Sequence, residues 1–244
     1  MRWKCSCAYD GTHYAGWQTQ NGQESVQEVI ETAIEAIVKH RIVIHGSGRT
    51  DAGVHALEQV FHFDYDWKHG GERLVKAVST KLPRSIKLLS ATPVDEEFHA
   101  RFSAVSKRYH YRLFLGDADP FLWPYCLSVP RQLDLNVMKR GMDLLVGEHD
   151  FAAFAANRGL EYESTVRQMK AVELTLADRL VLVSFEANGF MYKMVRSLVG
   201  SLLNVGLGRL ALDDLQNLLE SRQRTPLVEA SPARGLFLEK VFYA

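Results

Sequence analysis

The chain has 244 residues, of which 47% are hydrophobic and 24% charged, and its 29 basic and 29 acidic residues give a formal net charge of zero. This is ordinary globular composition, long enough for one large domain or two of usual size. No run approaches the roughly 18 apolar residues of a membrane span, and the first residues lack the apolar stretch of a secretory signal. We therefore expect a cytoplasmic protein without membrane association.

Hydrophobic periodicity in the first half predicts the order strand, helix, strand, strand, helix, strand. In the first strand, Cys5 and Cys7 share one face, where we expect two small buried thiols rather than a metal or redox site. Ser25 and Glu28 form a capping box that begins the first helix. Strands are expected over residues 3–9, 42–45, 59–63 and 86–91, and helices over residues 26–38 and 74–79.

The second half repeats a similar order of elements. Residues 108–115 alternate as a strand does, with Tyr109 and Tyr111 on one side. Two further strands form a pair around Ala177-Asp178. This pair spans residues 167–176 and 180–187. A last strand is expected over residues 236–242, and helices are expected over residues 136–146, 190–205 and 213–221.

Two halves of similar order predict an α+β fold of two ferredoxin-like units. We expect them to form a largely antiparallel sheet, with helices on one face and an active-site cleft between the halves. The predicted N-terminal domain spans residues 1–104 and the predicted C-terminal domain spans residues 105–244.

The segment from Gly48 to His55 is the strongest candidate for chemistry. Asp51 follows Arg49 by two residues and lies between Gly48 and Gly53, which let the backbone turn sharply and let a bulky partner approach. An arginine nearby could keep the carboxylate ionised beneath a ligand. A charged carboxylate under a ligand is suited to covalent catalysis.

Two other interpretations of Asp51 stay open at this point. Asp51 could cap a turn through its side chain, which is the usual role of an aspartate in a glycine-rich loop. It could also form half of a metal site with His55, four residues on, although Gly53 argues against a helix there and no second pair completes the site.

Three further segments carry candidate binding residues. The loop over residues 9–20 is rich in aromatic and glutamine side chains, which suits base stacking, or else forms a buried turn. Residues 98–116 contain no acidic residue and could hold phosphates, or could be solvated faces. Arg196 lies off the apolar side of its helix and could be aimed at a carboxylate, or be simply exposed. The basic residues are Arg101, Lys107, Arg108 and Arg112 in the acid-free stretch, and Lys193, Arg196 and Arg209 further on.

Together these segments resemble the TruA family of tRNA pseudouridine synthases over almost the whole chain. Single motifs of this kind are weakly to moderately specific, whereas so many in the right order are highly specific. The matching segments are residues 9–20, 25–27, 48–56, 98–103, 107–112, 147–151, 165–167, 194–200 and 233–236.

The resemblance implies an RNA-modifying isomerase that converts uridine to pseudouridine without a redox cofactor, metal or ATP. It implies that Asp51 is the essential carboxylate and that Arg196 is its arginine partner. Tyr109 matches the tyrosine that stacks on the target ring, and Arg49 matches the arginine near the vacated position of the flipped base. The implied substrate is the tRNA anticodon arm at positions 38, 39 and 40, bound by a homodimer.

Two hypotheses of other classes compete with this one. The chain could be an RNA-binding module of the same fold that has lost catalysis, although such a module has no need of a carboxylate beside RNA phosphates. It could also be a metal-dependent hydrolase built on Asp51 and His55, which activity in the presence of a chelator would separate from the isomerase.

Overall fold

The computed structural model describes residues 1–156 and 162–244. The chain forms two compact units, the first made of Met1–Val105 with Phe237–Ala244 and the second of Ser106–Leu236. The C-terminal strand thus belongs to the first unit. A division into folding domains at residues 1–104 and 105–244 stays a prediction.

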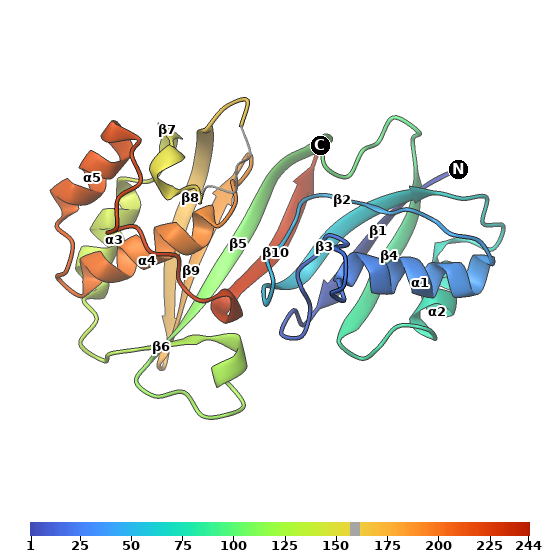
Figure 1. The fold of residues 1–244 in the computed structure, drawn as a ribbon, viewed down its shortest axis with the longest axis horizontal. Coiled ribbons are helices and arrows are strands. Elements are labelled where there is room, and N and C mark those ends of the chain that lie inside the picture. The colour runs from blue at the N-terminus through green and yellow to red at the C-terminus, as the bar shows by residue number, and fades with distance from the viewer. Residues whose placement is uncertain (157–161) are drawn as a thin grey trace. The chain divides into compact units, whose positions relative to one another are not determined.

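The first unit is a sheet with two helices (Figure 1). Strand β1 (Arg2–Tyr9) lies between β4 (Ile86–Val94) and β3 (His55–Asp64) and is antiparallel to both. The short β2 (His45–Gly46) pairs antiparallel with β3, and β10 (Leu236–Tyr243) pairs parallel with it. Helices α1 (Val26–Val38) and α2 (Gly71–Ser79) lie on the same side of these strands.

Local signals explain the elements that were predicted correctly. Ser25 accepts a hydrogen bond from the Glu28 backbone N–H at the start of α1, as expected of the cap. The alternation of β1 buries Trp3, Cys5 and Cys7, whose exposed fractions are at most 2%. Both cysteines are free thiols, and burial raises the pKa of each, as the prediction of inert buried thiols requires.

The predicted strand over residues 42–45 is wrong for most of its length, because β2 contains only His45 and Gly46. The backbone of Ile44 is hydrogen-bonded to side chains of α1 instead of to a neighbouring strand. Its N–H donates to Glu31 Oε1 (3.1 Å) and its carbonyl accepts from Gln27 Nε2 (3.1 Å). An apolar run whose polar backbone atoms are paired in this way needs no strand partner.

The second unit contains a sheet in the order β5, β9, β8, β7, with β6 parallel to β5. The predicted pair of strands is confirmed, and Asp178 turns between them with a positive φ of 54°. Helices α3, α4 and α5 pack on one another, and α3 packs on β8 (Figure 1). The bounds are β5 Ala104–Leu115, β6 Leu127–Val129, β7 Gly147–Asp150, β8 Val166–Ala177, β9 Leu180–Ala187, α3 Leu135–Asp143, α4 Met194–Gly206 and α5 Leu212–Ser221.

The predicted helix over residues 190–205 begins later than expected, at Met194. Lys193 has a positive φ of 57°, which no helical residue adopts, so the chain turns sharply just before α4. The mixed sheets and helices confirm an α+β fold, and strand pairing within each unit is largely antiparallel. Across the described ranges, no helix has the length and apolar character needed to cross a bilayer.

Candidate active site

Asp51 lies in an irregular loop between β2 and β3, where its side chain is half-buried. The backbone of this loop is tied to residues 14–17. Trp17 N–H donates to the Thr50 carbonyl (3.1 Å), and Gly53 N–H donates to the Tyr14 carbonyl (3.3 Å). These bonds hold the backbone on both sides of the carboxylate.

Two glycines allow this close approach. Gly16 has a positive φ of 98°, and a Cβ placed on it would lie 2.5 Å from the Thr50 carbonyl oxygen. A Cβ on Gly11 would lie 2.0 Å from the Val54 carbonyl oxygen. Only glycine fits where one backbone runs directly against another. The loop over residues 9–20 therefore acts as a brace for the Asp51 loop.

The aromatic side chains of this brace are core residues. Tyr9, Tyr14 and Trp17 are at most 6% exposed, and the Tyr9 hydroxyl is hydrogen-bonded to Thr50 Oγ1 (2.8 Å). Of the two interpretations of residues 9–20, the buried turn is therefore correct for these three rings. All three rings belong to the core, and Tyr14 also lines the open pocket beside Ala52.

Arg49 is exposed, and its Nε donates a hydrogen bond to Gln18 Oε1 (3.0 Å). Gln59, fully buried on β3, accepts from Ser47 Oγ (2.7 Å) and donates to the Gly48 carbonyl (3.0 Å). The sequence analysis did not single out Gln59. Its position on the buried face of a strand next to the glycine-rich loop was the available signal.

His55 helps to hold the loop and is only 1% exposed. Its Nδ1 lies 3.1 Å from the Gly11 backbone nitrogen and 3.2 Å from Asp10 Oδ1, contacts that require opposite protonation states of Nδ1. The buried Gly11 N–H needs an acceptor, and in this contact the acceptor is His55 Nδ1. In residues 1–156 and 162–244, no three His, Cys, Asp or Glu side chains are grouped as metal ligands.

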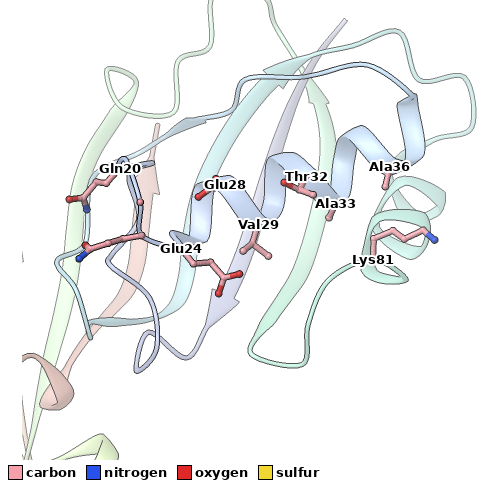
Figure 2. Close-up of a pocket in the computed structure, with 10 residues that line it drawn as sticks. Gln20, Glu24, Glu28, Val29, Thr32, Ala33, Ala36 and Lys81 are labelled. Carbon is pink, nitrogen blue, oxygen red and sulfur yellow. The ribbon is translucent and has the colours of Figure 1, made fainter.

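Pockets on the first unit include one near Asp51 and one along α1. An open one of about 590 Å³ is lined partly by Ala52 and Gly53, directly after Asp51. A groove of about 600 Å³ runs along α1, with Gln20 near one end and Lys81, after α2, near the other (Figure 2). The lining of this groove includes no residue of the Asp51 loop, whereas the pocket beside Ala52 borders that loop.

Arg196 occupies the first turn of α4 and is half-buried. Its Nε donates to the Ser231 carbonyl (2.7 Å), and Ser231 N–H donates to the Arg196 carbonyl (3.0 Å). One turn later, a Cβ on Gly200 would lie 2.0 Å from the Glu229 carbonyl oxygen. The segment over residues 229–231 therefore crosses α4 at close range and fixes the direction of the Arg196 guanidinium.

Tyr109 and Tyr111 lie on the same buried side of β5, as predicted. Tyr109 is 8% exposed, and its ring meets the edge of Phe190 at 5.1 Å between centroids. Tyr111 is fully buried and donates its hydroxyl to the Pro232 carbonyl (2.7 Å), and burial raises its pKa. Tyr111 is thus a structural residue.

Arg108, predicted as a possible phosphate ligand, is paired within its own sheet. Its Nη2 lies 2.7 Å from Glu186 Oε2, and Ser106 Oγ donates to the other Glu186 oxygen (2.8 Å). Burial alone would raise the pKa of Glu186, but the hydrogen bonds from Arg108 and Ser106 and the arginine charge outweigh it and lower the pKa. For Arg108, the structural interpretation of the basic stretch is favoured.

The predicted residues belong to both units, Arg49 and Asp51 to the first and Tyr109 and Arg196 to the second. Within each unit, separate contacts hold these residues or the backbone beside them. The role of each residue toward a substrate stays a prediction.

Comparison with known proteins identifies the family. The family described as tRNA pseudouridine synthase matches residues 6–103 and 142–244. The chain is 42% identical over 240 residues to tRNA pseudouridine synthase A of Chlamydia muridarum, covering 97% of this chain and 90% of the relative. It is 38% identical over 245 residues to tRNA pseudouridine synthase A 1 of Protochlamydia amoebophila, covering 99% and 96%.

A crystal structure of a Cbf5-Nop10-Gar1 complex superposes with a TM-score of 0.36 at 12% identity, covering 82% of this chain and 54% of that chain, which is too low to define a common fold. The sequence similarity to these two relatives, by contrast, spans nearly the whole of this chain and most of each relative. The chain belongs to the TruA family of tRNA pseudouridine synthases.

Proposed function

We propose that this enzyme isomerises uridine to pseudouridine in the anticodon arm of tRNA, at positions 38, 39 and 40, through the carboxylate of Asp51. Full-length similarity to relatives named tRNA pseudouridine synthase A supports the reaction. The observation that carries the role of Asp51 is the bracing of its loop, because a half-buried aspartate on an immobilised backbone is prepared for one geometry.

The reaction conserves atoms and electrons. The bond between N1 and C1′ breaks, the base turns, a bond forms between C5 and C1′, and the proton lost from C5 is replaced by one at N1. Such an isomerisation needs no oxidant, reductant or ATP. Attack on C6, attack on C1′ and a glycal route all require an ionised carboxylate beside an extruded base.

The other site residues then have complementary roles. Tyr109 stacks on the target ring, Arg49 lies near the position that the flipped base has left, and Arg196 pairs with Asp51 so that its charge is not buried alone. Each half of the enzyme is a ferredoxin-like unit. The working enzyme is a cytoplasmic homodimer that needs no cofactor.

The test of this proposal is Asp51→Asn, with Asp66→Asn as the matched control on an exposed aspartate of the same unit. Pseudouridine formed in a tRNA transcript is measured by release of tritium from C5, and tRNA binding is measured separately. We expect Asp51→Asn to abolish turnover while leaving binding largely intact, and Asp66→Asn to change neither. Near-normal turnover in Asp51→Asn would falsify the proposed role.

Two further measurements fix the reaction class and the site. Turnover that persists in a chelator separates the isomerase from a metal-dependent hydrolase. Mapping of pseudouridine in total tRNA from cells lacking this protein should show losses at positions 38, 39 and 40. Unchanged modification at all three positions would contradict the assigned substrate.

A further inference from the structure

A series of side-chain hydrogen bonds, here called the relay, joins helix α1 to Arg49, two residues before Asp51. Glu31 and Gln27 lie one turn apart on α1, each only 6% exposed, and Gln27 Nε2 donates to Glu31 Oε1 (2.8 Å). Gln18 Nε2 donates to Gln27 Oε1 (2.8 Å). Arg49 Nε donates to Gln18 Oε1 (3.0 Å). The relay thus runs from the buried carboxylate of Glu31 to the exposed guanidinium of Arg49.

The direction of every bond in this chain is fixed by its two ends. Glu31 Oε1 accepts hydrogen bonds here and a guanidinium only donates them, whereas an amide side chain has one end of each kind. Glu31 therefore draws the NH₂ group of Gln27, which leaves the Gln27 oxygen to accept from Gln18. The Gln18 oxygen is then left to accept from Arg49. Turning either amide round would place two donors or two acceptors face to face.

Backbone groups lock the buried half of the chain. Ile44 N–H donates to Glu31 Oε1 (3.1 Å), and Gln27 Nε2 donates also to the Ile44 carbonyl (3.1 Å). Thr19 N–H donates to Gln27 Oε1 (3.3 Å). These contacts leave the Gln27 amide one orientation. The fold therefore sets the orientation of Gln18, and with it the oxygen that accepts from Arg49, before any ligand binds.

We propose that Gln27 and Gln18 are positioning residues that orient the Arg49 guanidinium for the bound RNA. This inference rests on the proposed function, in which Arg49 contacts RNA near the flipped base. A hydrogen bond at Nε fixes the plane of the guanidinium, and an exposed arginine otherwise samples many rotamers. The relay therefore pre-organises a group that would otherwise have to be ordered when tRNA binds.

The decisive experiment is a double-mutant cycle between Gln18 and Arg49. Gln18 is half-buried, so Gln18→Ala should leave the fold intact, and Gln20→Ala is the matched control. Gln20 is an exposed glutamine of the same loop, and its Nε2 donates to the Ala15 carbonyl (2.8 Å) outside the relay.

We expect Gln18→Ala to lower kcat/KM by about 10-fold in the otherwise unchanged enzyme, as loss of a hydrogen bond to a charged group does. In an Arg49→Ala background, Gln18→Ala should lower kcat/KM by less than about 2-fold, because Gln18 acts on the RNA through Arg49. Gln20→Ala should cost less than about 2-fold in both backgrounds. An equal loss from Gln18→Ala in both backgrounds would overturn the proposal.

A second readout does not depend on activity. Hydrogen exchange of the Arg49 Nε–H, followed by ¹⁵N NMR, should be slowed in the unchanged protein and in Gln20→Ala but fast in Gln18→Ala. A protected Arg49 Nε–H in Gln18→Ala overturns the relay itself. If protection is lost in Gln18→Ala but Arg49→Ala keeps full activity, the relay exists and the proposed contact of Arg49 with RNA is overturned. Failure of the relay and failure of the proposed function therefore give different results.

Discussion

Asp51 and Arg196 are held by different means. The backbone around Asp51 is irregular and is kept in place by hydrogen bonds from residues 14–17 and by the buried amide of Gln59. Arg196 is carried by a regular helix, and one crossing segment at Ser231 bonds both its backbone and its guanidinium. The loop depends on many polar contacts from distant parts of the chain, whereas the helix depends on few.

This difference predicts where each region is vulnerable. A loop without regular structure has only its braces to fix it, so removing one brace should disturb both stability and the carboxylate. A helix retains its own hydrogen bonds when a neighbouring segment shifts. Mutations in the loop's brace should therefore cost more than equivalent mutations at the α4 crossing.

The largest effect is expected from Gly16→Ala. The new Cβ would meet the Thr50 carbonyl oxygen at 2.5 Å, and φ of 98° is strained for alanine. We expect a loss of about 4 kcal/mol in the free energy of unfolding, measured by urea denaturation. Gly22→Ala is the matched control, because Gly22 has a similar φ of 77° with no atom within 4 Å of its Cβ.

Gly22→Ala should show the backbone strain alone, about 1 kcal/mol. If both variants lose the same stability, the close approach of residues 14–17 to the Asp51 loop is not what Gly16 provides. Pseudouridine formation by Gly16→Ala should also fall by more than that of Gly22→Ala, since only Gly16 touches the loop.

Much of this fold could be predicted from the sequence because the signals are local. The Ser25 cap, the alternation of β1 and the turn at Asp178 each depend on residues within one element or its end. The strand over residues 42–45 could not be judged in this way. Its backbone partners are Gln27 and Glu31, and nothing in an apolar run reveals that a helix side chain will replace a strand.

Acid should destabilise the first unit through His62 at a higher pH than it acts on Glu186 of the second. His62 on β3 is 3% exposed, and its Nδ1 accepts from the Ala100 N–H (3.2 Å). Burial first, and then the neighbouring His99, His45 and Arg2, lower its pKa to about 4. The unfolded chain, with a histidine pKa of about 6.5, then binds more protons than the folded one, so stability is full above about pH 6.5 and declines down to about pH 4.

The expected loss over this range is about 3 kcal/mol. Glu186 of the second unit has a pKa below the ordinary glutamate value of 4.5. The stability that it contributes is therefore lost only as the pH falls below about 4.5. Urea denaturation at pH 7, 5.5 and 4 tests the window. His62→Gln keeps an acceptor for Ala100 without titrating, and it should flatten the dependence between pH 6.5 and 4. An unchanged slope would show that other groups produce it.

The α4 crossing is tested by Gly200→Ala. Its Cβ would lie 2.0 Å from the Glu229 carbonyl oxygen, so the crossing segment must move, while alanine favours the helix by about 1 kcal/mol. We expect a net loss of about 2 kcal/mol in unfolding free energy, smaller than for Gly16→Ala. Gly141→Ala on α3 is the control, because its nearest neighbours are leucine methyl groups at 3.1 and 3.2 Å that can shift.

The candidate site was only partly predictable for the same reason. The motif around Asp51 is a contiguous run, so its residues could be identified directly from the sequence. The contacts that hold it come from residues 14–18 and from Gln59, and the bond between Gln18 and Arg49 joins residues 31 positions apart. Whether Tyr14 and Trp17 stack on a base or fill the core likewise depends on which faces the rest of the fold covers.

The smallest effect is expected at Tyr109, which meets Phe190 edge to face through its ring. If Tyr109 stacks on the target base, Tyr109→Phe should retain most activity, whereas Tyr109→Leu should lose about 10-fold in kcat/KM, equal to about 1.4 kcal/mol. Single-turnover kinetics on a tRNA transcript would measure both, with urea denaturation as the check on folding. Equal losses in the two variants would assign the work to the hydroxyl group instead. A loss that appears only as reduced stability would make Tyr109, like Tyr111, a structural residue of β5.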